Sequence, residues 1–132
     1  MDIPCRRVQV FSWRQADGTE TRWFVDMAID LISYAERRGY KIPTAELTLE
    51  DAKYILTTNR NLFEEPLKPE NIDAANLGVP LIAVELRDNS DGQLKHVIID
   101  GWHRLHKAVK IDWQAPIIVH VLPEKLAKEV EV

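Results

Sequence analysis

The sequence predicts an α+β domain, a small mixed sheet with helices packed against it. Segments rich in β-branched and aromatic residues recur along the chain, and several of them alternate between apolar and polar positions. Between them lie segments whose apolar residues follow helical spacing. The expected order is two strands, two helices, two strands, a helix and a strand. This order favours mixed α/β structure with a largely antiparallel sheet.

Length and charge narrow the class further. The chain has 132 residues, of which 45% are hydrophobic, so we expect a single domain over residues 1–132 with a proper core. Seventeen Lys and Arg against twenty-one Asp and Glu give a net charge of −4. A protein that coats duplex DNA through its net charge would show the opposite balance. Any phosphate contact must therefore come from a local cluster of basic residues.

Cysteine usage and hydropathy point to the cytoplasm. Cys5 is the single cysteine, so the chain cannot form an internal disulfide, and we interpret this residue as incidental. Residues 1–7 carry basic side chains, but no apolar segment typical of a signal peptide follows them. Apolar runs are only a few residues long, far below a membrane span. We expect a cytoplasmic protein that has no membrane partner.

The amino-terminal part reads as a hairpin followed by a helix. Residues 8–13 are β-rich, and the Asp17-Gly18 pair is a strong hairpin-turn signal before a return strand over 21–25. From Met27 the apolar period becomes helical, and Gly39 supplies a plausible stop.

A second helix is predicted after a short extended connector at 41–43. Thr48 is its expected N-cap, Glu50 and Asp51 fill its first turn, and it runs to about Thr58. Residues 64–69 read as a loop, and Pro69 is suited to start a short helical turn.

The last third of the chain is the most regular. Strands are predicted over 79–86, 96–99 and 116–122, with a turn at 88–92, a helix over 102–110 and a charged helix over 124–132.

The junction at Asp100-Gly101 carries the functional information. A strand runs straight into a helix, so free backbone N–H groups and the helix dipole favour an anion at this point. Gly101 allows a close approach to the backbone, and Arg104 in the first turn has a planar fork suited to phosphate. Basic residues at a helix start are unfavourable unless an anion binds there. The alternative is a purely structural turn in which the Asp100 carboxylate caps the helix.

The residues around this junction resemble a known motif. Asp100-Gly101-Trp102-His103-Arg104-Leu105, with Ala108, is similar to the DGxHR box of the ParB/sulfiredoxin superfamily. In that family a strand precedes the box, a helix carries it and a further strand closes the unit. The matching region here covers about residues 79–122.

The resemblance implies that the chain handles a nucleotide such as ATP or CTP. By position, Gly101, His103 and Arg104 would hold its phosphates, and Lys107 on the same helix adds to this cofactor-binding cluster. The family includes CTP-binding partition proteins, ATP-using sulfiredoxins, nucleotide-dependent kinases and members with ATPase or nuclease activity.

Departures from the family pattern exclude some of these activities. Trp102 stands where sulfiredoxins carry their catalytic cysteine, so sulfinic acid reduction is not expected. Residues 42–46 lack the Pro-Arg motif of partition proteins, and no helix-turn-helix domain follows, so we expect no centromere reading.

Two functions remain open. The first is a Mg²⁺-dependent phosphohydrolase, an ATPase or a nuclease, in which Asp100, His103, Arg104 and Glu46 are the catalytic candidates and Asp100 is the metal ligand. Further candidates for the general base are Glu50, Glu64 and Glu65. The alternative is a non-catalytic regulatory or interaction protein with the same fold. Its partner would be another protein or single-stranded nucleic acid. A metal site built from His103, His106 and Asp100 is less favoured, because no other ligand spacing supports it.

Aromatic and basic residues of the predicted hairpin offer a further surface. We expect Trp23 and Trp102 in the core and Trp13 half-exposed, where it is able to stack on a base. Arg14 and Arg22 are predicted to face each other across the strands. We favour an ordinary solvated sheet face there over a second anion site.

Overall fold

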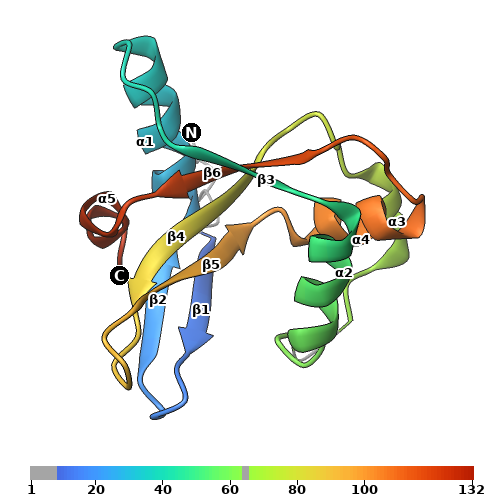
Figure 1. The fold of residues 1–132 in the computed structure, drawn as a ribbon. Coiled ribbons are helices and arrows are strands. Elements are labelled where there is room, and N and C mark those ends of the chain that lie inside the picture. Colours follow the sequence, from blue (N-terminus) through green and yellow to red (C-terminus); the bar gives the residue numbers. More distant parts are fainter. Residues whose placement is uncertain (1–8, 64–65) are drawn as a thin grey trace, which may run out of the picture.

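The chain adopts a mixed α+β fold, as predicted. The computed structural model describes residues 9–63 and 66–132, which form five helices, a four-stranded mixed sheet and a two-stranded hairpin (Figure 1). Cys5, Glu64 and Glu65 lie outside the described residues. In the described part of the chain, no helix combines the length and the apolar character needed to cross a membrane.

The hairpin pairs β1 (Val10–Arg14) with β2 (Glu20–Phe24). Its turn is the predicted one: the Asp17 carboxylate accepts a hydrogen bond from the Thr19 N–H at 2.9 Å, and Gly18 has a φ of 89°. The expectation that Arg14 faces Arg22 is wrong. Arg14 pairs with Glu20 and Ser12 with Arg22, so the two arginines are diagonal neighbours on the exposed face. The turn sets this register, in which the partner of Arg14 lies two residues before Arg22.

The main sheet has the order β3-β6-β4-β5, from the strands β3 (Thr44–Leu47), β6 (Ile117–Leu122), β4 (Leu81–Arg87) and β5 (Leu94–Asp100). The pairs β3–β6 and β4–β5 are antiparallel, whereas β4 and β6 run parallel. Strand β3 was not predicted. It is a short edge strand with three exposed residues, so it carries no hydrophobic period that sequence reasoning can detect.

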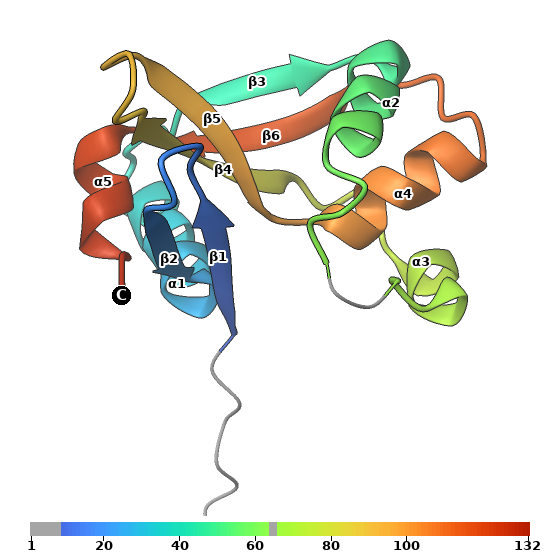
Figure 2. The same cartoon turned by 90° about the horizontal axis from the view of Figure 1, so that it is seen from below.

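The helices gather at two ends of the sheet. Helices α2 (Leu49–Thr58), α3 (Pro69–Ala74) and α4 (Trp102–Lys110) lie together at one end, and α1 (Val25–Arg37) and α5 (Glu124–Glu129) lie at the other (Figures 1 and 2). The cap predicted for α2 is confirmed as a capping box. The Thr48 hydroxyl accepts from the Asp51 N–H at 3.1 Å, and the Asp51 carboxylate accepts from the Thr48 N–H at 2.9 Å.

The core runs through β4 and reaches the first turn of α4. Trp23 and Trp102 are buried, as expected, and Trp13 is half-buried. The Trp102 ring stacks on Phe11 with ring centroids 6.3 Å apart, and its indole N–H donates to the Ile98 carbonyl at 3.0 Å. Trp102 therefore joins the hairpin, β5 and α4 in one packed unit.

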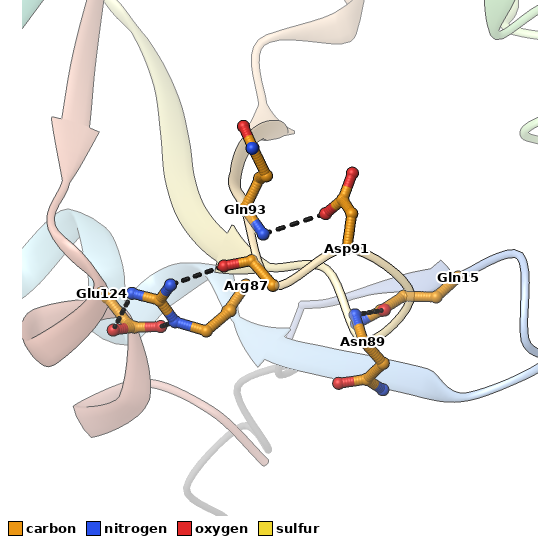
Figure 3. Close-up of polar contacts among 7 residues, drawn as sticks. Gln15, Arg87, Asn89, Asp91, Gln93 and Glu124 are labelled. Atoms are coloured by element: carbon orange, nitrogen blue, oxygen red, sulfur yellow. Dashed lines mark hydrogen bonds and ion pairs between the residues drawn. The ribbon is translucent and has the colours of Figure 1, made fainter.

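Polar contacts hold the opposite end of the molecule together (Figure 3). Arg87 donates to both carboxylate oxygens of Glu124 at 3.1 and 3.3 Å and to the Gly92 carbonyl at 2.6 Å, which ties β4, the following turn and α5 together. The Asn89 N–H donates to the Gln15 side chain at 2.8 Å, which joins that turn to the hairpin. Hydrogen bonds from Arg87 lower the pKa of Glu124 below its ordinary value.

Candidate functional site

The strand–glycine–helix junction forms as predicted, and its geometry requires glycine. Strand β5 ends at Asp100, α4 begins at Trp102, and Gly101 between them has a φ of 102°. A Cβ atom on Gly101 would lie 2.7 Å from Cγ of Leu81 on β4. Glycine is needed here for the left-handed backbone and for packing against β4, whether or not a ligand binds.

The first turn of α4 has no side-chain cap. Gly101 is the N-cap residue, no side chain of residues 9–63 and 66–132 caps the turn with a hydrogen bond, and the turn holds no acidic residue. The alternative expectation, that Asp100 caps this helix, is wrong because its carboxylate accepts from Nη2 of Arg104 at 3.0 Å. The positive end of the helix dipole is thus left without a negative side chain in its first turn.

Arg104 is turned inward. Its side chain is 15% exposed. Besides the Asp100 bond, Nη1 donates to the carbonyls of Val79, at 3.1 Å, and Pro80. The guanidinium thereby ties the entry of β4 to the end of β5. These three contacts use three of the five N–H donors of an arginine, so two donors are left for other groups.

Lys107 and Lys110 contact α3 instead of the α4 start. Lys107 donates from Nζ to the carbonyls of Asp73 and Ala75, both at 2.8 Å, and Lys110 pairs with the Asp73 carboxylate at 2.6 Å. A cation on the last carbonyls of a helix satisfies acceptors that have no partner within the helix. Lys107, which the sequence placed in the phosphate cluster, therefore positions α3 in this structure.

The two histidines of α4 are half-buried. His106 lines a cleft of about 350 Å³ between α2 and α4, which we call the α2–α4 cleft. Burial, and next the nearby charge of His103, lower the pKa of His106 below its ordinary value of 6.5. His106 is therefore mainly neutral at pH 7. The other lining residues are Leu56, Asn59, Arg60, Phe63, Pro66, Leu67, Ile72 and Trp102.

Glu46 does not join this cluster. It lies on the edge strand β3, where it pairs with Ile118, and it lines another cleft with Glu50, Trp113 and Gln114. This second cleft shares no lining residue with the α2–α4 cleft. The structure thus keeps the expected general base apart from His106 and Trp102.

The residues at the junction do not fit a metal site built by the protein. Over residues 9–63 and 66–132, no group of three or more His, Cys, Asp or Glu side chains is arranged to hold a metal ion. Asp100, the expected ligand, already shares its carboxylate with Arg104. A Mg²⁺ ion at Asp100 would meet a guanidinium 3.0 Å from the same oxygen.

Sequence reasoning missed the residues of α2 and the following turn that complete the cleft. Asn59, Arg60 and Phe63 come from a polar segment without a motif, so their placement depends on how α2 packs against α4. The edge of Phe63 packs against Trp102 with ring centroids 5.9 Å apart. Arg60 comes directly after a predicted helix, and no sequence signal indicates that it lines the same cleft as His106.

Comparisons with protein-family models, with curated proteins and with solved structures found no match. The geometry of the α4 junction and of the cleft beside it is therefore the basis for a functional proposal.

Proposed function

We propose that this chain is a nucleotide-binding domain of the ParB/sulfiredoxin-like type, whose ligand places its phosphates at the first turn of α4. The observation that carries the proposal is the uncapped start of this helix, with Gly101 in the left-handed conformation and no acidic residue in the turn. Backbone N–H groups at such a helix start bind anions. His103 lies in this turn, and the resemblance of the box to that superfamily supports the same assignment.

The α2–α4 cleft supports a ligand larger than free phosphate. Trp102 is the first residue of α4 and also lines the cleft, so the cleft adjoins the uncapped turn. Arg60 contributes a cation from the end of α2, and Phe63 and Trp102 provide aromatic surface. A nucleotide with its phosphates at the turn and its base against these side chains satisfies both parts of the site.

Arg104 and Lys107 have different roles in this proposal. Arg104 holds the backbone around Gly101 through Val79, Pro80 and Asp100, and its two remaining donors are available to a phosphate. Lys107 positions α3, whose Ile72 lines the cleft. His103 and the backbone of the first turn are the groups that would contact the phosphates directly.

The geometry favours binding over hydrolysis. An ATPase or nuclease needs a carboxylate or another base to position water at the phosphate. Among the candidate bases that the structure describes, Asp100 is engaged by Arg104, and Glu46 and Glu50 lie in the other cleft. Glu64 and Glu65 lie outside the described residues. We therefore favour the non-catalytic alternative, a domain that binds a nucleotide and regulates a partner.

Thermal unfolding with ATP, CTP, GTP and inorganic phosphate tests this proposal. A nucleotide at about one hundred times its Kd stabilises the folded state by about 2.7 kcal/mol, which raises Tm by several degrees for a chain of this size. We expect the shift to be lost in His103→Ala and reduced in Arg60→Ala. It should persist in Arg37→Ala, a matched control on α1. If no nucleotide raises the Tm of the wild-type protein, the proposal is wrong. Release of phosphate from a nucleotide during the experiment would instead favour the hydrolase.

A further inference from the structure

A further cavity lies on the face of the main sheet and shares Asn59 and Trp102 with the α2–α4 cleft. It has a volume of about 150 Å³, and we call it the sheet cavity. Its floor includes Ala45 on β3 and Ala83 on β4, two small side chains that leave space above the strands. The remaining walls are Trp13, Leu47, Ile55, Asn59, His96, Val97, Ile98, Trp102, Val119 and Val121.

The size and the walls of the sheet cavity restrict its ligand. A cavity of about 150 Å³ with apolar walls holds one benzene molecule in an engineered protein. Here the walls are aliphatic and aromatic, apart from Asn59 and His96. The Asn59 amide already donates to the Ile55 carbonyl at 2.8 Å. A single planar ring fits these walls, whereas a sugar or a phosphate would lose hydrogen bonds with water without replacing them.

The rim of the sheet cavity is positively charged. Trp13 and Asn59 also line a wider open cleft of about 950 Å³, which contains Arg14 from the hairpin and Arg60 from the end of α2. In the part of the chain that the structure describes, neither arginine has a carboxylate within 4.0 Å. Glu20 lies on the same cleft, so two cations face one anion there.

We infer that the sheet cavity binds a monocyclic aromatic anion, with its ring above Ala83 and its charged group between Arg14 and Arg60. The ring removes apolar surface from water, and the anion stays at the open rim where the two arginines are exposed. This site shares Trp102 and Arg60 with the α2–α4 cleft, but His103 at the start of α4 is not among its lining residues. The ligand is a free aryl carboxylate, because the carbonyl and N–H groups of a pyrimidine base would lose hydrogen bonds with water at these walls.

Calorimetric titration with benzoate, benzyl alcohol, acetate and UMP tests the inference. We expect benzoate to bind more tightly than benzyl alcohol, which lacks the charge, and acetate, which lacks the ring, not to bind. Ala83→Leu fills the cavity and should abolish benzoate binding. Arg14→Ala should weaken it by up to about fivefold, the usual range for an exposed ion pair. Arg22→Ala, on the exposed face of the same hairpin, is the matched control.

A second cavity-filling variant and further ligands separate the possible outcomes of this test. Ala45→Leu narrows the same cavity from the exposed edge strand, so it replaces Ala83→Leu if the buried substitution prevents folding, which circular dichroism reports. Benzoate binding that Ala45→Leu removes would support the inference, whereas UMP binding that Ala45→Leu removes would overturn it, because the cavity would then accept a polar base. If benzoate does not bind, or if both filling variants bind benzoate like the wild type, the inference is also wrong. ATP or CTP binding that His103→Ala removes and Ala45→Leu leaves intact belongs to the α4 site, so the two proposals fail separately.

Discussion

The start of α4 and the rim of the sheet cavity are both basic, yet their cations are used in opposite ways. At α4, Arg104 donates to backbone carbonyls just before β4 and Lys107 to carbonyls at the end of α3, and little of the Arg104 side chain is exposed. At the rim, Arg14 and Arg60 are exposed and line an open cleft. A basic residue inside a motif is thus able to serve the fold, while the two arginines outside any motif have no ion-pair partner among the described residues. Stability and binding measurements separate the two uses.

Arg104→Ala should give the largest loss of stability. It removes the partner of the Asp100 carboxylate, which is mostly buried, and of the carbonyls of Val79 and Pro80. Loss of one partner of a buried pair costs about 3–5 kcal/mol. Urea unfolding should show this loss, and Arg104→Lys should restore part of it.

The opposite result would change the role of Arg104. The free energy of unfolding of Arg104→Ala would then lie within about 0.5 kcal/mol of the wild-type value, the range of an ordinary surface substitution. If this variant also shows no Tm shift with nucleotide, the side chain binds the ligand and does not stabilise the fold.

Gly101→Ala should give the next largest loss. The residue must adopt a φ of 102°, and its Cβ would lie 2.7 Å from Cγ of Leu81. Backbone strain and overpacking together predict a loss of about 2–4 kcal/mol in the free energy of unfolding. Gly18→Ala is the matched control, because Gly18 has a φ of 89° but no atom within 4 Å of the added Cβ. That variant should lose about 1–2 kcal/mol, from strain alone. Equal losses in the two variants would show that Leu81 moves aside.

Lys107→Met should have a smaller and more local effect. The substitution keeps the aliphatic stem but removes the donor to the carbonyls of Asp73 and Ala75, which costs about 1 kcal/mol. Hydrogen exchange should become faster in α3 and stay unchanged in β4. Lys110→Met is the control, since its ion pair with Asp73 is exposed and should contribute under about 0.5 kcal/mol. Faster exchange throughout the chain would mean that Lys107 supports the whole fold.

Local chemistry explains which features were predictable from the sequence. The Asp17-Gly18 turn, the Thr48 cap and the Gly101 bend each depend on neighbouring residues, and each appears where expected. The edge strand β3 and the parallel pairing of β4 with β6 depend on partners far along the chain.

The same distinction applies to the candidate site. The sequence identified Arg104 as a phosphate ligand because it stands in a basic helix start. In the structure it also donates to the Val79 carbonyl, 25 residues away. The direction of a side chain depends on such distant groups, whereas the motif records only its position. The sequence did not indicate the sheet cavity either. Its small floor residues, Ala45 and Ala83, come to one face of the sheet only when β6 pairs with both β3 and β4.

The pH dependence of His106 should be the smallest effect. Burial lowers its pKa in the folded state below the unfolded value of about 6.5, so the unfolded chain binds the proton more readily. The contribution to stability is complete above pH 6.5 and is lost as the pH falls from 6.5 through the folded pKa. His106→Gln should therefore flatten this part of the stability curve, as urea unfolding between pH 5 and 8 would show. An NMR titration in which His106 has a pKa at or above 6.5 would contradict the burial that defines the α2–α4 cleft. Such a value would mean that the cleft is open to water around this imidazole, and it would favour a cationic His106 as a further contact for a nucleotide phosphate.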